Sequence, residues 1–563
     1  MQVDRLVTSI AVALGCAATI TSCTVDVHVI LPGLGTGLAD DEGESRGDSE
    51  GETQGDGDEL DESDESVDPS LDLGDGEGLA EQSCLVTDHD APLPCDLGPT
   101  SDVIDPIIAW TWTGPLGEDS VLVTPLVANL DDDNFDGLIN LCDTPDVVVL
   151  AVNLPASKSD PIPPGRLYMI DGRHGTTTRV FDHPLDATVT PAIADLDGDG
   201  VAELIAFERA APIDPGQIGE RRVVAFTNDG ELLWASDNFV WSEGGGAIAI
   251  ADLDADGSPE ILAPEHVLTA DGELLWAPPE PPLANSVPVA VDLDLDGDLE
   301  VLFGGSVYAH DGELLIELQQ PGGQKNSGMA AIANFDADEF PEIYIQSNKH
   351  RIFEHDGTPK AECNGGNSHP VAIDDLDGDG LAEILSAHAS WFRALTIVDD
   401  ECETLWSRKL EDLDPTASGT AFDLLADGRA EAIYADLEQV RLFDYQGQVI
   451  TQIPRTARSS DANPVVVDAD NDGAAELVLV GSEPIGGDAI AGERPSVLLI
   501  QNVDDAFAPT RRIWNQHAYH GTNIREDARV PAEQSPHWMD ANGFRTNSTP
   551  TYVGALCQPP TTE

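Results

Sequence analysis

The sequence has few basic residues: 26 Lys and Arg stand against 105 Asp and Glu among 563 residues, a formal net charge of −79. Nucleic-acid binding and docking to anionic lipid both need clustered Lys and Arg, so this shortage argues against either partner. Aromatic residues are also scarce at 5%, whereas there are 52 Gly and 39 Pro, which favours short strands joined by turns. At about 150 residues per domain, the length allows three or four domains or one large repeat array.

The sequence also lacks an apolar run long enough to span a bilayer comfortably. Its most apolar stretch, Leu6 to Ile20, follows Arg5 and ends in Ile20-Thr21-Ser22-Cys23, which resembles a bacterial lipobox. We therefore expect residues 1–23 to be a lipoprotein signal peptide, with lipid attached to Cys23 after cleavage; an ordinary cleaved signal is the alternative. The predicted location is the bacterial cell envelope, at the outer membrane or cell surface, or alternatively outside the cell, with membrane contact only through the lipid anchor.

Bulky residues are nearly missing from residues 40–80, which hold 18 acids and one base. Such a segment cannot bury enough apolar surface to offset chain entropy, so residues 24–82 are predicted to be a disordered acidic linker. A short lead-in over residues 83–104 follows.

A CxxC motif is missing, so the cysteines do not indicate a zinc or redox motif. Apart from Cys16 and Cys23, six cysteines remain, and an even number in an exported chain favours three disulfides. Cys84–Cys95 would close a local loop and Cys363–Cys402 would link neighbouring repeats, while the remaining pairings stay open. The six candidates are Cys84, Cys95, Cys142, Cys363, Cys402 and Cys557.

The most informative pattern is an internal repeat of the form D-x-D-x-D-G-x-x-E. Five copies match in full, and their acids are Asp195, Asp197, Asp199, Glu203; Asp252, Asp254, Asp256, Glu260; Asp292, Asp294, Asp296, Glu300; Asp375, Asp377, Asp379, Glu383; and Asp468, Asp470, Asp472, Glu476. A sixth copy, with Glu339 in place of Gly, offers Asn334, Asp336, Asp338 and Glu342. Two weaker copies offer Asp132, Asn134, Asp136 and Asn140, and Asp423, Asp427 and Glu431, the last having Leu425 at its third position.

This spacing predicts calcium sites. Side chains at loop positions 1, 3, 5 and 9 can direct oxygen atoms to one point, and glycine at position 6 allows a turn with positive φ. Six or seven hard oxygen ligands at a flexible site suit Ca²⁺ better than Mg²⁺, and zinc or copper would need nearby Cys or His. An EF-hand would place its last acid at position 12 between two helices, whereas these loops are flanked by short apolar, strand-like segments. Solvated acidic turns would not require glycine at a fixed position.

The repeat predicts an all-β β-propeller after the acidic linker. The later loops are 40 to 48 residues apart, a spacing typical of propeller blades. A second landmark, an Asp-Gly pair such as Asp229-Gly230 or Asp271-Gly272, indicates a hairpin in each unit, which gives four antiparallel strands per blade. Residues 107–112 resemble the strand after each hairpin and would complete the last blade. Eight loops predict eight blades over residues 105–510; seven is the alternative if the first unit is an appendage.

In these loops the sequence resembles the FG-GAP/VCBS repeats of bacterial surface proteins and of the integrin α-subunit propeller. The resemblance covers roughly residues 105–510 and implies that the Asp, Asn and Glu residues above bind several structural Ca²⁺ ions. It also implies an extracellular adhesion or binding scaffold without naming a ligand; we expect the ligand to be a protein or a glycan. Oligomeric state is not predicted.

Enzymatic activity is the alternative function. A propeller hydrolase or lyase acting on extracellular polysaccharide would use acids that here belong to the loops, and a Gly-x-Ser-x-Gly motif is missing from residues 105–510. A quinone-dependent dehydrogenase would carry repeated Gly-x-x-x-Trp. Trp234 and Trp276 match this pattern, whereas Trp406 follows Cys402 instead of glycine and Ile316 replaces the tryptophan. We interpret these tryptophans as packing between blades and expect no catalytic residue and no organic cofactor.

The C-terminal segment, residues 511–563, departs from the repeat and is rich in Trp, His and Asn. His517 and His520, with Asn515 and Arg512, would form either a ligand pocket or a brace that closes the ring through buried hydrogen bonds. We favour the brace because the spacing fits no zinc motif.

Overall fold

The computed structural model describes residues 103–548, except 116, 156–159, 210–218, 243–244, 280–285, 326–327, 337, 347–348, 365–370, 389, 411–418, 437, 456–461 and 483–494. The described residues fall within one compact unit, Leu73–Glu563. The predicted signal peptide, the acidic linker and Cys23, Cys84, Cys95 and Cys557 lie outside them. None of the helices in the described part is long and apolar enough to cross a membrane.

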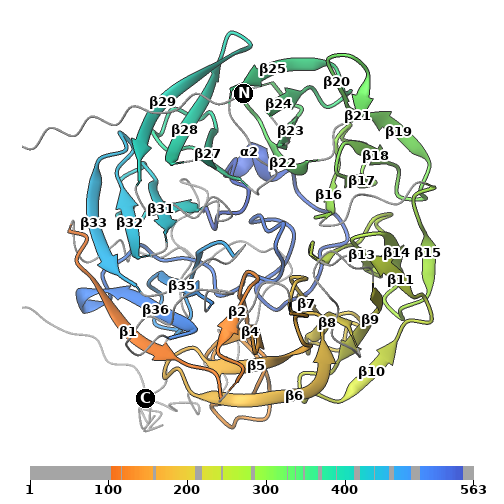
Figure 1. Cartoon of the computed structure of the whole chain (residues 1–563), viewed down its shortest axis with the longest axis vertical. Helices are drawn as coiled ribbons and strands as arrows, with labels where there is room; N and C mark the ends of the chain where they lie inside the picture. The colour runs from red at the N-terminus through yellow and green to blue at the C-terminus, as the bar shows by residue number, and fades with distance from the viewer. Residues whose placement is uncertain are drawn as a thin grey trace, which may run out of the picture. The chain divides into compact units, whose positions relative to one another are not determined.

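The described chain forms a ring of four-stranded antiparallel blades, which confirms the predicted β-propeller (Figure 1). The innermost strands of successive blades are neighbours around the ring. From the centre outward, the strands are β3 (Leu126–Ala128), β4 (Asp146–Val152), β5 (Gly165–Asp171) and β6 (Thr177–Leu185) in blade 1; β7 (Ala192–Ala194), β8 (Glu203–Glu208), β9 (Gly219–Phe226) and β10 (Leu232–Ala235) in blade 2; β12 (Ala249–Ala251), β13 (Glu260–Ala263), β14 (His266–Leu268) and β15 (Leu274–Trp276) in blade 3; and β16 (Val289–Val291), β17 (Glu300–Phe303), β18 (Ser306–Tyr308) and β19 (Leu314–Glu317) in blade 4.

The second half of the ring repeats this plan. Its strands are β22 (Met329–Ala333), β23 (Glu342–Gln346), β24 (His350–Phe353) and β25 (Pro359–Cys363) in blade 5; β26 (Ala372–Asp374), β27 (Glu383–His388), β28 (Trp391–Val398) and β29 (Glu401–Lys409) in blade 6; β30 (Thr420–Phe422), β31 (Glu431–Ala435), β32 (Gln439–Phe443) and β33 (Val449–Pro454) in blade 7; and β34 (Val465–Val467), β35 (Glu476–Val480), β36 (Val497–Asn502) and β1 (Pro106–Trp112) in blade 8. Smaller elements are β2 (Ser120–Val121), β11 (Val240–Ser242), β20 (Gln319–Gln320), β21 (Gln324–Lys325), η1 (Val503–Asp505) and α2 (His537–Asp540).

The ring is closed by its N-terminal strand, as the sequence predicted. Strand β1 pairs antiparallel with β36, from Pro106 opposite Asn502 to Trp112 opposite Val497. The first repeat unit forms a blade of its own rather than an appendage, so the described residues contain eight blades rather than seven.

Neighbouring blades pack through the outer strands and the predicted Asp-Gly turns. Gly272, in the β14–β15 turn of blade 3, lies against the Trp234 indole of blade 2, and Gly312 of blade 4 lies against Trp276 of blade 3. A Cβ atom at Gly272 would lie 2.5 Å from the Trp234 ring. Trp276 also donates a hydrogen bond from Nε1 to the His310 carbonyl (2.8 Å). These tryptophans therefore pack between blades, as the sequence indicated.

The chain after β36 runs into the centre of the ring, where Figure 1 shows it as the blue segment that includes α2. Isolated β-bridges join Trp514 to Val127 of blade 1, Arg529 to Asp195 of blade 2 and Phe544 to Ile373 of blade 6. Trp514 and Phe544 are fully buried. The segment therefore supplies the core that the short inner strands face.

Candidate metal centres

The acidic loops gather at one end of the ring, because each connects the first strand of a blade to its second. Neighbouring loops contact each other there. The Leu299 amide of the fourth loop donates to the Leu253 carbonyl of the third (2.9 Å), and Asn471 of the eighth donates from Nδ2 to the Leu141 carbonyl of the first (3.4 Å). One face of the ring therefore carries a circle of carboxylates.

The loops share one hydrogen-bonded frame. In seven of them the position-1 carboxylate accepts a hydrogen bond from the backbone N–H of the glycine at position 6. Examples are Asp195 with Gly200 (2.9 Å) and Asp252 with Gly257 (2.7 Å). The other pairs are Asp132–Gly137, Asp292–Gly297, Asp375–Gly380, Asp423–Gly428 and Asp468–Gly473. The glycine that the sequence singled out therefore turns its amide toward the first acid.

The residue at position 4 of these loops also has a positive φ, like the glycine at position 6. The repeat pattern did not indicate this. Gly198 and Gly378 occupy it in two loops, with φ of 77° and 78°, but Ala255 (54°) and Leu295 (61°) occupy it in others. Residues other than glycine lose on the order of 1 kcal/mol in this region. The loop frame holds them there, so each loop has a defined shape before any ion is considered.

The acid at position 9 begins the second strand and is buried at the base of each loop. Glu203 accepts a hydrogen bond at Oε2 from the Leu196 amide (2.8 Å), and equivalent bonds reach position 2 in the other loops that have Glu at this position. Burial, helped by the aspartates of the same loop, raises the pKa of Glu203, Glu260 and Glu300 to about 7 and that of Glu383 to about 8. Desolvation is the largest cause of each of these pKa shifts.

The carboxylates converge as the sequence predicted. Ligand-capable oxygens lie within 4.8 Å of one another in Asp195–Asp197–Asp199, in Asp252–Asp254–Glu260, in Asp292–Asp294–Glu300 and in Asp375–Asp377–Glu383. The donors are all oxygens, the set that Ca²⁺ prefers.

A buried oxygen without a hydrogen-bond partner in the eighth loop also supports a cation site. Glu476 is fully buried, and its Oε2 accepts a hydrogen bond from the Ala469 amide (2.8 Å). Its Oε1 has no hydrogen-bond partner within the described part of the chain, and neither has Oδ1 of Asp470. A buried polar atom without a partner is costly, and a bound cation would satisfy both oxygens.

The first loop differs from the expected ligand set. Asn140 does not take the position of Glu203: the residue paired with the end of the first strand is Asp146, opposite Ala128. A buried acid that the pattern missed, Asp143, accepts hydrogen bonds from the amides of Asn134 (3.3 Å) and Asn140 (2.8 Å). Asp143 is the twelfth residue counted from Asp132, the spacing at which an EF-hand loop places its last acid. That spacing was the signal available in the sequence.

The seventh loop keeps the frame without the full ligand set. Asp423 accepts hydrogen bonds from the amides of Asp427 (3.0 Å) and Gly428 (2.7 Å), and Glu431 accepts one from Leu424 (3.1 Å). Leu425 stands where the other loops have a carboxylate or amide. The frame therefore forms without that ligand.

The fifth loop contains a cation of its own. Asp336 and Asp338 gather with Glu354, an acid that the pattern missed, and the ammonium of Lys360 lies among them. Glu342 is also within reach of this ammonium (3.0 Å). Asn334, expected as a ligand, turns its amide nitrogen to the Asp338 carbonyl (2.6 Å).

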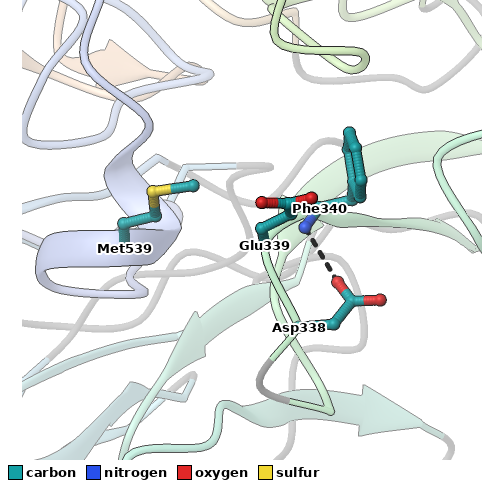
Figure 2. A pocket seen from close by; sticks show the side chains of 4 residues that line it. All are labelled: Asp338, Glu339, Phe340 and Met539. Carbon is teal, nitrogen blue, oxygen red and sulfur yellow. Dashed lines mark hydrogen bonds between the residues drawn. The ribbon is translucent and has the colours of Figure 1, made fainter.

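Beside this loop, a hollow of about 520 Å³ is lined by Asp338, Glu339, Phe340 and Met539. Figure 2 shows Met539 on α2 facing Glu339 and Phe340 across it. The Phe340 ring is stacked on His355, with 4.2 Å between ring centroids. The hollow therefore combines exposed carboxylates with apolar side chains at the boundary between blade 5 and the central segment.

The polar residues of the C-terminal segment form buried contacts with the blades. His517 Nδ1 lies 3.1 Å from the Thr124 hydroxyl, and Asn515 donates from Nδ2 to the Ile193 carbonyl (3.2 Å). Arg512 donates to the Leu141 carbonyl (2.8 Å), and His520 is stacked on His537, with centroids 4.1 Å apart. Each of these contacts ties the segment to a blade or to itself, which is the arrangement expected of a brace.

One predicted disulfide is present. Cys363 of β25 and Cys402 of β29 are bonded, with Cα atoms 5.3 Å apart, so the bond joins the outer strands of blades 5 and 6. Cys142 is disulfide-bonded as well.

No protein-family model matches the chain, and no curated protein sequence is similar to it. Solved structures are similar to it, and the first of the three that follow is similar enough to show a shared fold. The V. cholerae biofilm matrix protein Bap1 matches with a TM-score of 0.63 at 18% identity, over 79% of this chain and 99% of Bap1. Rhamnogalacturonan lyase YesW matches with a TM-score of 0.46 at 15% identity, over 83% of this chain and 84% of the enzyme. The Bacillus licheniformis lyase PL11 gives 0.46 at 14% identity, over 84% of each chain.

Proposed function

We propose that the protein is a non-enzymatic, calcium-binding β-propeller of the FG-GAP/VCBS type, displayed at the bacterial cell envelope as an adhesion or ligand-binding module. The observation that carries the proposal is the shared loop frame, which places carboxylate oxygens within 4.8 Å of one another around a buried acid. In the eighth loop that acid, Glu476, has an oxygen without a partner among the described residues. An all-oxygen site of this kind suits Ca²⁺.

In this proposal calcium is structural. Asp195, Asp197 and Glu203 would hold one ion between β7 and β8, and the corresponding residues would do so in the other complete loops. The ion would offset the repulsion among carboxylates that otherwise face one another. Because the site does not exist in the unfolded chain, the free energy of ion binding adds to the free energy of unfolding.

A binding role fits the remaining observations. The sequence predicts export and a lipid anchor at Cys23. The structural similarity to Bap1, a biofilm matrix protein, supports an extracellular scaffold. In seven loops the acid at position 1 accepts a hydrogen bond from the glycine amide of its own loop, an arrangement that favours ion binding over acid–base chemistry. The hollow beside Phe340 and Met539 offers a ligand both carboxylates and apolar surface.

The calcium part is tested by thermal unfolding of the full chain, carrying Cys23→Ser so that it is not lipidated. We expect the melting temperature to fall strongly when EGTA replaces Ca²⁺ and to recover when Ca²⁺ is restored in excess, with Mg²⁺ much less effective. An identical melt in Ca²⁺ and EGTA would contradict structural calcium binding.

The ligand part is tested with the same protein on arrays of glycans and bacterial surface proteins. We expect binding that requires Ca²⁺ and that is lost in Phe340→Ala or Met539→Ala, with Leu315→Ala on the outer strand β19 as control. Turnover of a polysaccharide, or the absorbance of a bound quinone, would contradict a non-enzymatic role.

A further inference from the structure

The ammonium of Lys360 lies among four carboxylates at the fifth loop. Its Nζ is 2.6 Å from Asp336 Oδ2, 3.0 Å from Glu342 Oε1, 2.9 Å from Glu354 Oε1 and 3.6 Å from Asp400 Oδ1. The Lys360 side chain is only 3% exposed. An ammonium with carboxylates on several sides is a buried cation site, because a charge at this depth is stable only when it is paired.

The backbone directs Lys360 to this place. Pro359 pairs with Phe353 and Ala361 pairs with Ile352, so Lys360 is the additional residue of a β-bulge between β24 and β25. A β-bulge changes the direction of a side chain relative to a regular strand. The lysine therefore reaches the loop of its own blade from the outer strand.

The same bulge recurs in other blades with an uncharged residue. The register shifts place Leu233 at this position in blade 2, Leu275 in blade 3, Leu315 in blade 4 and Ile450 in blade 7. Blade 1 has Thr178 there, and its hydroxyl donates a hydrogen bond to Asp146 at the base of that blade's loop (3.2 Å). The bulge position thus reaches the loop base in two blades, and only Lys360 brings a charge to it among the bulge residues named here.

The loop of blade 5 carries matching changes. Asn334 replaces the aspartate at position 1, which removes one carboxylate, and its amide donates to the Asp338 carbonyl (2.6 Å). Glu339 replaces the glycine at position 6, whose amide bonds the first acid in seven other loops. Both changes fit a loop whose positive charge comes from the chain.

We propose that Lys360 takes the place of the calcium ion in blade 5, so that this loop is neutralised by the protein itself and binds no metal. The proposal builds on calcium binding by the other loops. The ligand set Asn334, Asp336, Asp338 and Glu342 then belongs to an internal ion pair, and blade 5 keeps its loop geometry when the other loops lose their ions.

The number of bound calcium ions per chain tests this. The full chain with Cys23→Ser is dialysed against Ca²⁺, and the bound metal is measured by elemental analysis. Lys360→Met keeps the length of the side chain and removes its charge, so we expect it to bind one more ion than the parent. Leu315→Met, at the equivalent bulge of blade 4, is the matched control and should leave the count unchanged.

The reverse change provides a second, independent result. Leu275→Lys places an ammonium at the same bulge position in blade 3, and we expect it to bind one ion fewer than the parent. Equal counts in the parent and Lys360→Met would overturn the proposal. If Lys360→Met does not fold, an unchanged count in Leu275→Lys would overturn it. A parent protein that binds no calcium would instead contradict the proposed function.

Discussion

Glu476 shows at the scale of one residue how a loop can be stable with an ion and strained without it. The side chain is fully buried, and burial beside Asp470, Asp468 and Asp472 raises its pKa well above the usual range. A carboxylate in this position is unfavourable without a cation and favourable with one.

We therefore expect Glu476→Gln to have opposite effects in two media. In EGTA the variant should melt at or above the temperature of the parent, because a buried charge among like charges is gone. In Ca²⁺ it should melt lower, and the eighth site should bind the ion at least about tenfold more weakly. Thermal unfolding and calcium titration measure both effects. Glu313→Gln, an exposed acid outside the loops, is the control; a loss of stability in EGTA as large as that in Ca²⁺ would contradict the argument.

His266 in β14 gives a prediction about pH. The residue is buried, both ring nitrogens lack a hydrogen-bond partner among the described residues, and burial lowers its pKa to about 4. The unfolded chain takes up this proton near pH 6.5, so His266 costs no stability above that pH and an increasing amount as the pH falls toward 4.

Replacement by Phe should remove this acid sensitivity. We expect the free energy of unfolding of His266→Phe, measured relative to that of the parent, to be about 2 kcal/mol larger at pH 5 than at pH 7.5. This value follows from a pKa of about 4 in the folded chain and about 6.5 in the unfolded chain. Urea unfolding at both pH values measures it. Protonation of the loop carboxylates at low pH affects the variant and the parent equally, so it cancels in the comparison. If the difference in free energy of unfolding between the two proteins were the same at both pH values, the prediction would be contradicted.

At the scale of elements, neighbouring blades pack where the outer strand of one blade contacts the Asp-Gly turn of the next. Gly272 has φ of 79°, and a Cβ there would lie 2.5 Å from the Trp234 ring. Gly322, in the β20–β21 turn, has φ of 103°, and a Cβ there would contact nothing within 4 Å. The two glycines separate backbone strain from steric overlap.

We expect Gly322→Ala to lower the free energy of unfolding by about 1 kcal/mol through backbone strain alone. Gly272→Ala should cost about 1–3 kcal/mol more, because the indole must move out of a packed junction. Urea unfolding in excess Ca²⁺ measures both. If both variants lost the same free energy of unfolding, the Trp234 indole would have moved without any energetic cost, and the prediction would be contradicted.

The sequence predicted those elements whose signals are local. Loops with acids at fixed offsets, Asp-Gly turns and the closing strand β1 could be recognised because each pattern lies within a few consecutive residues. Lys360 could not, because a lysine 18 residues beyond its loop carries no signal in D-x-D-x-D-G-x-x-E. Asp143 was missed because its signal, the twelve-residue spacing from Asp132, lies outside that pattern. For the central segment the sequence indicated a brace but not its partners, since Arg545 donates to the carbonyl of Val371, 174 residues earlier in the chain.

At the scale of the whole ring, the central segment touches blades far apart in the sequence. Trp514 is fully buried, is stacked on Tyr519 with centroids 4.4 Å apart, and exchanges backbone hydrogen bonds with Val127 of blade 1. Asn547 donates from Nδ2 to the Val466 carbonyl of blade 8 (3.0 Å). The segment is thus part of one cooperative core.

Trp514→Ala should therefore lower the stability of the entire ring, by about 3–5 kcal/mol, in a single transition. Tryptophan fluorescence and far-ultraviolet circular dichroism should report the same midpoint. Leu233→Ala, at a half-exposed position on β10, should cost far less. An early transition of the segment, with unchanged melting of the ring, would show that the segment is only docked.

The pairing of β1 with β36 has a consequence for the order of events during synthesis and folding. Pro106 cannot meet Asn502 until nearly 400 further residues have been made, and the core needs the segment up to Asn547. A chain dominated by such distant contacts folds slowly. A newly made chain therefore exposes its acidic loops before the ring can close.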